Sequence, residues 1–241
     1  LLLIITLSML MTPMLFLAYD YLHKRFEGAK QTSEPDEIDH AGPVIIAGVG
    51  RFGQIVNRLV ESSGFKTVVL DNNLKRIQLM RSFGYRAFLG DPTRPELLRA
   101  AGLRDARVLV VSLDDTEAGL RLVRHARKER PDIHIIARAR DRGHVFALYE
   151  AGANDIVREL FDSSLRAGRY VLENVGMTEY EAAEAEQAFY AHDRMALKEL
   201  AQLWKPDQDM ASNEAYRKRV RELEKELELS LQALAEKKDS A

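Results

Sequence analysis

The sequence predicts an α/β protein built on a doubly wound parallel sheet, and two observations carry this prediction. Short apolar runs alternate with helical patterns through the middle of the chain, and the first run, VIIA, leads directly into the glycine-rich turn GVGRFG. Asp71 ends the second apolar run, TVVLD, 18 residues after the last glycine of that turn. Strand, glycine turn, helix, second strand and terminal acid therefore follow the order of a dinucleotide-binding, Rossmann-like fold.

The chain begins with an uncharged stretch, Leu1 to Tyr19, which predicts a transmembrane helix. As a helix it would span about 28 Å, close to the roughly 30 Å hydrocarbon core of a bilayer. A basic flank follows it, whereas a signal peptide would begin with a basic region. We therefore expect residues 1–22 to be the end of a transmembrane helix, in the C-terminal part of a larger membrane protein, with the next part in the cytoplasm. The alternative is a buried helix of a soluble domain.

Residues 23–42 are polar and rich in turn formers, as expected of a cytoplasmic linker, and residues 43–158 carry the sheet pattern. The expected strands are Val44–Ala47, Thr67–Leu70, Arg86–Phe88, Val108–Val111, Ile133–Ile136 and Asp155–Val157. Helical patterns lie between them, at residues 52–63, 73–82, 95–101, 115–129 and 141–151. In such a sheet we expect ligands beyond the carboxyl ends of the strands.

Residues 159–241 are predicted to form a helical extension. Its helices are expected at Phe161–Asn174, Glu179–Leu203 and Asn213 to about Lys237. In the last helix, apolar residues recur every three or four positions and form one stripe: Tyr216, Val220, Leu223, Leu227, Leu231 and Leu234. This stripe indicates packing against the chain's own domain or, alternatively, contact with another subunit.

The glycine turn predicts a nucleotide site. Gly48 would permit the tight turn, Gly50 the close approach of backbone amides to a phosphate, and Gly53 the tight packing of helix on strand. The unpaired amides and the dipole of the helix N-terminus favour an anion there. Asp71 is placed to accept hydrogen bonds from ribose hydroxyls and would oppose a 2′-phosphate, so NAD(H) or AMP is favoured over NADP(H). The alternative is a purely structural turn. The candidate cofactor-binding residues are Gly48, Gly50, Arg51, Phe52, Gly53, Asp71, Asn72, Asp91, Thr93 and Ser112.

Composition narrows the function classes. A net charge of −2 without a basic block gives no indication of nucleic-acid binding, and the absence of cysteine excludes disulfides, thiolate metal sites and cysteine nucleophiles. The six histidines have no metal-binding spacing, so we expect no metal site. No Tyr-x-x-x-Lys pair occurs and no second α/β domain follows the sheet, which disfavours a NAD-dependent oxidoreductase. Asp114 and Asp115 are better explained as a helix cap than as an acid/base pair, so we expect no catalytic residues and no enzyme.

Six segments, in their order and spacing, resemble a known family: GVGRFGQ, the acid of VVLD, FGYRAFLGDPTRPELLRAAG, VSLDD, IIARARD and AGANDIVRE. Over about residues 43–194 the chain resembles the cytoplasmic nucleotide-binding domain, called RCK or KTN, of Kef-type potassium efflux antiporters. The resemblance implies a regulatory domain on the cytoplasmic side of the bacterial inner membrane that gates potassium/proton antiport. It also implies a homodimer, an upstream antiporter membrane domain that carries potassium, and an ancillary flavodoxin-like subunit.

In this family the nucleotide is largely structural, and glutathione or its adducts bind between two protomers and set antiport activity. By analogy, the glutathione contacts fall on Arg58, Arg158 and the position of Asp193. Phe83 matches an aromatic that senses adduct bulk, with core packing as its alternative. The glutathione-gated members carry asparagine at position 193, and a carboxylate there would repel an anionic tripeptide unless it is protonated or paired with Arg194. A nucleotide-regulated domain of a channel or transporter without glutathione control therefore stays open as an alternative.

Overall fold

The computed structural model describes residues 11, 13–19, 36, 38 and 42–239, without the side chains of residues 234–239. The chain divides into two compact units, Leu1–Pro35 and Asp36–Ala241. In the first unit, residue 11 and residues 13–19 are helical. Among the described residues, no helix has the length and apolar character needed to cross a bilayer. Most of the predicted transmembrane segment at 1–22, and most of the predicted linker at 23–42, lies outside the described residues.

The doubly wound parallel sheet is confirmed. Six parallel strands pair in the order β3-β2-β1-β4-β5-β6. Their bounds are β1 (Val44–Ala47), β2 (Thr67–Asp71), β3 (Ala87–Leu89), β4 (Val108–Val111), β5 (His134–Ala139) and β6 (Asp155–Arg158). From β1 the chain adds strands toward one edge, and from β4 toward the other. The order therefore reverses between β1 and β4, the switch point where ligands bind in sheets of this kind.

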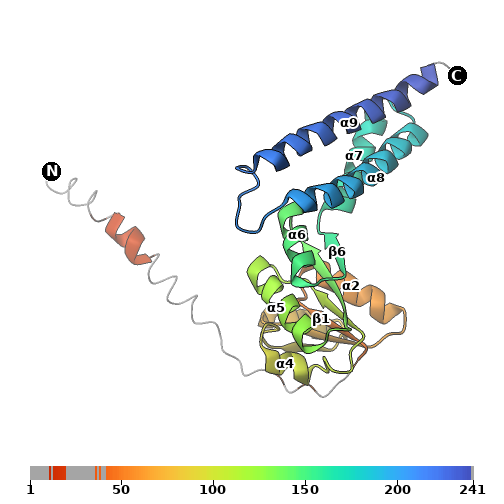
Figure 1. Cartoon of the computed structure of the whole chain (residues 1–241). Helices are drawn as coiled ribbons and strands as arrows, with labels where there is room; N and C mark the ends of the chain where they lie inside the picture. Colours follow the sequence, from red (N-terminus) through yellow and green to blue (C-terminus); the bar gives the residue numbers. More distant parts are fainter. Residues whose placement is uncertain (1–10, 12, 20–35, 37, 39–41, 240–241) are drawn as a thin grey trace, which may run out of the picture. The chain divides into compact units, whose positions relative to one another are not determined.

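Helices cover both faces of the sheet (Figure 1). One face carries α2 (Arg51–Ser62) and α3 (Leu74–Ser82), and the other carries α4 (Pro95–Ala100), α5 (Thr116–Glu129) and α6 (Arg142–Ala151). Side chains alternate between the faces along each strand. In β1, Ile46 joins the smaller core with α3, whereas Ile45 and Ala47 join the larger core with α4, α5 and α6.

Four strands differ from their expected bounds: β2 and β6 each end one residue later, at Asp71 and Arg158, and β3 and β5 are shifted. β5 continues to Ala139, three residues past the expected end at Ile136. Ala137 and Ala139 are buried in the larger core, while Arg138 between them is ion-paired. The charged Arg138 interrupts the apolar pattern, so the sequence did not indicate that the strand continues. β3 lies one residue later than expected, because Arg86 remains exposed and Leu89 completes the pairing with β2.

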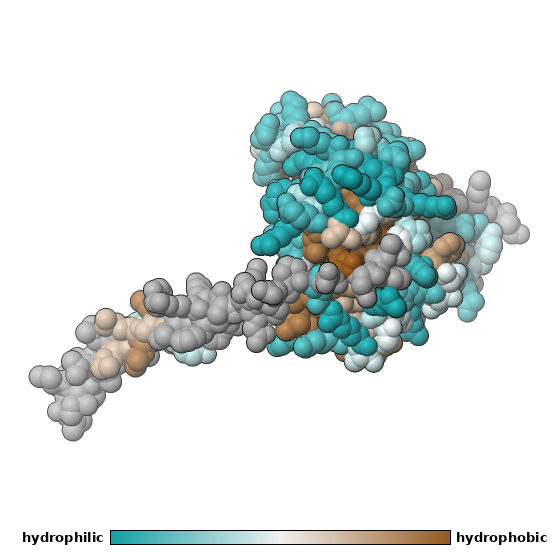
Figure 2. All heavy atoms as spheres, turned by 90° about the horizontal axis from the view of Figure 1, so that it is seen from below, coloured by the Kyte–Doolittle hydropathy of each residue, from teal (hydrophilic) through white to brown (hydrophobic). Residues whose placement is uncertain are grey.

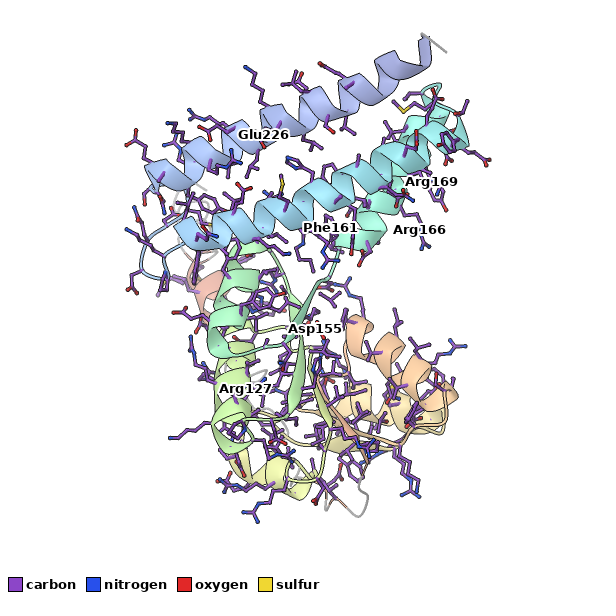
Figure 3. All side chains as sticks on the ribbon, turned by 45° about the vertical axis from the view of Figure 1, so that its right-hand side comes forward. Arg127, Asp155, Phe161, Arg166, Arg169 and Glu226 are labelled. Carbon is purple, nitrogen blue, oxygen red and sulfur yellow. The ribbon has the colours of Figure 1, made fainter. Side chains whose placement is uncertain are left out.

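Arg127 on α5 holds the turn between α6 and β6 (Figure 3). Its Nε and Nη2 donate to the Gly152 carbonyl at 3.0 and 2.8 Å, and its Nη1 donates to the Ile133 carbonyl at 2.9 Å. One guanidinium thereby satisfies carbonyl groups that precede both β5 and β6. These bonds fix the last two strands of the sheet against α5.

The helical extension is confirmed as α7 (Phe161–Asn174), α8 (Glu179–Leu203) and α9 (Glu214–Asp239). α9 lies along α8 (Figure 1). The first half of the predicted stripe, Tyr216, Val220 and Leu223, packs into the larger core together with Ala196 and Leu200 of α8. These contacts confirm packing against the chain's own domain for this half, whereas Leu234 lies outside the residues whose side chains are described.

The free edge of β3 is covered by a residue of the predicted linker. Asp36 donates its backbone N–H to the Leu89 carbonyl at 3.0 Å, and its carboxylate accepts the Leu89 N–H. Arg81, at the end of α3, donates to the Asp36 carboxylate at 2.6 Å and to the Ala87 carbonyl at 2.9 Å. Unpaired strand edges invite association with other strands, and these contacts satisfy the exposed backbone groups of β3.

Replacing Gly53 with alanine should lower the free energy of unfolding by about 1–3 kcal/mol, the usual effect of overpacking. A Cβ on Gly53 would lie 2.1 Å from the Gly48 carbonyl oxygen, so α2 would have to move away from the turn. Gly168→Ala is the matched control, because a Cβ there meets no atom within 4 Å. Alanine should stabilise that helix by about 0.5–1 kcal/mol. Chemical denaturation of both variants checks the difference, and equal stabilities would contradict the tight contact at Gly53.

Candidate functional site

The glycine turn, residues 48–53, joins β1 to α2 at the switch point and needs glycine at two of its positions. Gly48 has a φ of +97°, and a Cβ there would lie 2.8 Å from the Ser112 carbonyl oxygen. Gly53 brings α2 against the Gly48 carbonyl, as described above. The buried Ser112 hydroxyl donates to the same carbonyl at 2.6 Å. In this structure Ser112 therefore supports the turn from β4.

The N-terminus of α2 is suited to an anion. Its N-cap residue, Gly50, supplies no side-chain hydrogen bond, and no acidic residue lies in the first turn. By contrast, four other helices are capped by the side chains of Asn73, Asp115, Asp141 and Thr178. A Cβ on Gly50 would meet no atom closer than 3.7 Å. The first amides of α2 thus have no side-chain cap, the arrangement that phosphate groups use at helix N-termini.

Asp71 is buried at the end of β2, with only 3% of its surface exposed. One carboxylate oxygen accepts the Val49 N–H and the other accepts the Asn73 N–H, both at 2.8 Å. These bonds fix the carboxylate against the glycine turn. Each oxygen keeps a further lone pair, so the group can still accept hydrogen bonds from ribose hydroxyls.

The other predicted residues are less closely grouped. Arg51 opens α2 with an almost fully exposed side chain, Phe52 is half-buried, and Asn72 is exposed. Asp91 and Thr93 follow β3, two strands from β1, where Asp91 Oδ1 accepts the Thr93 N–H at 3.0 Å and the Thr93 hydroxyl at 2.8 Å. Within the described part of the chain, no hydrogen bond joins this pair to the glycine turn.

A row of alternating charges, which we call the switch-point row, was missing from the sequence prediction. Arg76 on α3 lies 3.5 Å from Asp71 and 2.9 Å from Asp114. Arg138 in β5 continues the row and binds Asp114 at 3.0 Å and Glu159 at 3.1 Å. Asp114 and Arg138 follow or end apolar runs and were identifiable by position. Nothing in the helical pattern of α3 singles out Arg76.

The charged state of this row is fixed by its own pairs. Burial raises the pKa of Asp114, but hydrogen bonds from Arg76 and Arg138 outweigh it and hold the pKa below its ordinary value. The hydrogen bond to Asp114 in turn raises the pKa of Arg76. The predicted cap is confirmed only for Asp115, which accepts the Ala118 N–H at 3.0 Å. Asp114 belongs to the ion-paired row instead.

A second cluster forms around Asp193 on α8, which is 3% exposed. Its carboxylate binds Arg142 of α6 at 2.9 Å and also accepts hydrogen bonds from both terminal nitrogens of Arg158. The Arg158 guanidinium lies 3.6 Å from the ring centroid of Phe161. Asp193 is therefore paired, although with these two arginines rather than with Arg194, which faces the ring of Tyr190.

Phe83 and Arg58, two further candidate residues from the sequence, are both exposed. The Phe83 side chain is 65% exposed, so the alternative interpretation of Phe83 as a core residue is wrong. Arg58 is exposed on α2 and forms no ion pair within the part of the chain that the structure describes. The same part contains no group of three or more side chains able to hold a metal ion.

The profile of the TrkA-N domain matches residues 44–159, which places the sheet domain in a class of Rossmann-like domains. The profile of the potassium efflux system KefB C-terminal domain matches residues 163–241. A solved structure, the Kef C-terminal domain of Shewanella denitrificans in AMP-bound form, shares 38% identity and superposes with a TM-score of 0.62. It is covered completely and covers 69% of this chain. The chain thus belongs to the Kef family of potassium efflux C-terminal domains.

Curated relatives give the same family. The glutathione-regulated potassium-efflux system protein KefC of Cronobacter sakazakii is 44% identical over 199 residues, 82% of this chain. KefC of Escherichia coli O157:H7 (strain EC4115) is 41% identical over 198 residues, again 82% of this chain. The match spans 32% of either relative, so the chain corresponds to about a third of their length.

Replacing Asp193 with alanine should lower the free energy of unfolding by about 3–5 kcal/mol, because it leaves a mostly buried Arg158 without its carboxylate. Asp155→Ala is the matched control. Asp155 pairs with His134 at 2.6 Å, but both side chains are largely exposed (Figure 3 labels Asp155), and such pairs contribute about 0–1 kcal/mol. Chemical denaturation compares the two variants. A similar small loss in both would show that the Asp193 cluster is not structural.

Proposed function

We propose that this chain is the cytoplasmic, nucleotide-binding regulatory domain of a potassium/proton antiporter in the bacterial inner membrane. The observation that carries the proposal is the uncapped N-terminus of α2 beside the buried Asp71, at the switch point of a Kef-family chain. In this proposal residues 1–22 end a membrane helix, residues 23–42 are the linker, residues 43–158 bind the nucleotide and residues 159–241 form a dimerisation region. Its role is regulatory rather than catalytic, as in the transport proteins it resembles.

The proposed nucleotide is AMP or NAD(H). The amides at residues 50–53 would bind its phosphate, and Asp71 would accept hydrogen bonds from the ribose hydroxyls. The negative charge of Asp71 would oppose a 2′-phosphate and so disfavour NADP(H). The AMP-bound state of the Shewanella relative supports an adenine nucleotide.

The surface supports a homodimer as the working form. No residue of α7 is buried in this chain, although Leu160, Val171 and Val175 on or beside it are large, apolar and mostly exposed. On α2, Ile55 and Leu59 are about 70% exposed. Brown patches break a mostly hydrophilic surface in Figure 2. Exposed apolar surface of this kind marks interaction sites, and a second copy of the chain is the proposed partner. An upstream membrane domain that carries potassium and an ancillary flavodoxin-like subunit complete the proposed assembly.

Gating then follows from differential binding. A ligand shifts the dimer only if it binds one arrangement more tightly than another, and each 1.4 kcal/mol of difference changes the equilibrium about tenfold. We propose that the linker at 23–42 transmits this change to the membrane helix. Glutathione or its adducts, bound through Arg58, Arg158 and position 193, would be the regulatory ligand, as the names of the KefC relatives indicate for those proteins.

One observation favours a second candidate, regulation by nucleotide without glutathione. Both terminal nitrogens of Arg158 already hold Asp193, and Arg142 binds the same carboxylate. A glutathione carboxylate would have to displace an internal carboxylate that is 3% exposed. Because Asp193 compensates one of the two arginine charges, the cluster attracts a second anion less strongly than two free arginines would.

Asp71 should determine recognition of the ribose. The wild type should bind AMP about tenfold more tightly than 2′-deoxy-AMP, because a buried acceptor loses its hydroxyl partner. Asp71→Asn should weaken AMP binding and reduce this preference. Circular dichroism of the variant checks that it is folded, which separates a loss of binding from damage to the turn. Isothermal titration measures both ligands. An unchanged preference in a folded variant would contradict the assignment of Asp71 to the ribose.

Asp193→Asn should create glutathione binding or strengthen it about tenfold or more, because it removes the internal carboxylate from Arg158 and Arg142. Isothermal titration of wild type and variant with glutathione measures the change. Arg194→Ala is the control, since the Arg194 guanidinium faces Tyr190 while Asp193 pairs with Arg142 and Arg158, and its loss should leave the affinity unaltered. Equal glutathione binding by wild type and Asp193→Asn would mean that Asp193 does not compete with the ligand.

A further inference from the structure

Arg76 lies over the end of α2 that we propose as the phosphate site. The atoms nearest to a Cβ built on Gly50 are Nη1 of Arg76, at 3.7 Å, and Oδ1 of Asp114, at 3.9 Å. Arg76 comes from α3, across the switch point from Asp114, which follows β4. Its guanidinium thus spans from the acid of β2 to the acid after β4, directly beside the uncapped helix.

The charges of this region oppose a phosphate unless Arg76 takes part. A phosphate monoester carries about 1.5–2 negative charges, whereas a helix N-terminus offers roughly half a positive charge. Asp71 and Asp114 flank the same space with two further negative charges. Arg138 is engaged by Asp114 and Glu159 and is only 8% exposed. Arg76 is a partly exposed cation that contacts both carboxylates and lies beside the helix end.

We propose that Arg76 makes this site selective for a phosphorylated nucleotide over the free nucleoside, by exchanging the Asp114 carboxylate for the phosphate of the ligand. The inference rests on the proposed nucleotide function and adds a specificity-determining side chain to it. A guanidinium binds phosphate with two parallel hydrogen bonds, as it binds a carboxylate, so the exchange replaces one partner with another of the same geometry.

Asp114 and Asp71, the two neighbours of Arg76, each keep other partners when Arg76 moves toward a ligand. Asp114 keeps Arg138 at 3.0 Å, and Asp71 keeps the two backbone amides at 2.8 Å. Arg76 itself is 38% exposed and reaches Asp71 only at 3.5 Å. The exchange therefore needs movement of one long side chain and leaves no buried charge unpaired.

The test compares AMP with adenosine by isothermal titration of the full-length protein in detergent. Arg76→Ala should weaken AMP binding about tenfold or more, the size expected for a hydrogen bond to a charged group. Adenosine affinity should stay within about twofold, because adenosine has no phosphate. Arg76→Gln, which keeps a polar side chain without the charge, should lose the same preference, whereas Arg76→Lys, which keeps the charge without the planar fork, should keep part of it. The Asn73 cap survives in every variant, since it accepts the backbone N–H of residue 76.

Lys75→Ala is the matched control, because it removes one positive charge from an exposed neighbouring position on α3. It should leave both affinities within about twofold. The proposal is overturned if Arg76→Ala and Arg76→Gln lower AMP and adenosine binding equally, if they leave AMP binding unchanged, or if Lys75→Ala has the same effect. Wild-type protein that binds neither ligand would instead overturn the proposed nucleotide function, and with it the role of Arg76.

Discussion

The close contact between Gly53 and the Gly48 carbonyl is the constraint on which the candidate site depends. It seats the N-terminus of α2 against the end of β1, which a side chain at either position would prevent. The neighbouring strands hold the same turn, because Ser112 donates to the Gly48 carbonyl and Asp71 accepts the Val49 N–H. Side chains at the ends of β2 and β4 thus hold the backbone of the turn after β1, and the first amides of α2 have no side-chain cap.

The features that could be predicted from sequence are those set by neighbouring residues. Apolar alternation gave the strands, and the glycine spacing gave the turn, because both depend on geometry within a few residues. Ion pairs depend on strand order instead. Asp114 lies 38 residues from Arg76 and 24 from Arg138, so its partners became visible only once the sheet was assembled. Its sequence neighbour Asp115 misled the interpretation toward a shared cap.

Asp193, on a helix, is a second residue whose ion-pair partners could not be predicted from its sequence neighbours. Sequence proximity suggested Arg194 as its partner, yet consecutive helical residues point in different directions, and side chains meet at spacings of three or four. The actual partners are 51 and 35 residues away, on α6 and at the end of β6. The two arginine clusters also differ in how far their ion pairs are buried. The pair of Asp193 with Arg158 is mostly withdrawn from water and costly to break, whereas Arg76 and Asp114 are partly exposed and can exchange partners more easily.

The two clusters share short stretches of backbone. Arg158 binds Asp193, and the next residue, Glu159, binds Arg138 of the switch-point row. Arg138 and Arg142 provide a second link, four residues apart across the start of α6. Glu159 is also fixed to β5 through its N–H to the Ala139 carbonyl, so both clusters contact the same segment. That segment leads into α7, which contacts α8 through Phe161 against Phe189 and Tyr190 but buries no residue within its own chain. Coupling between ligand sites requires an element that both sites bias, and the segment at Arg158 and Glu159 contacts both clusters.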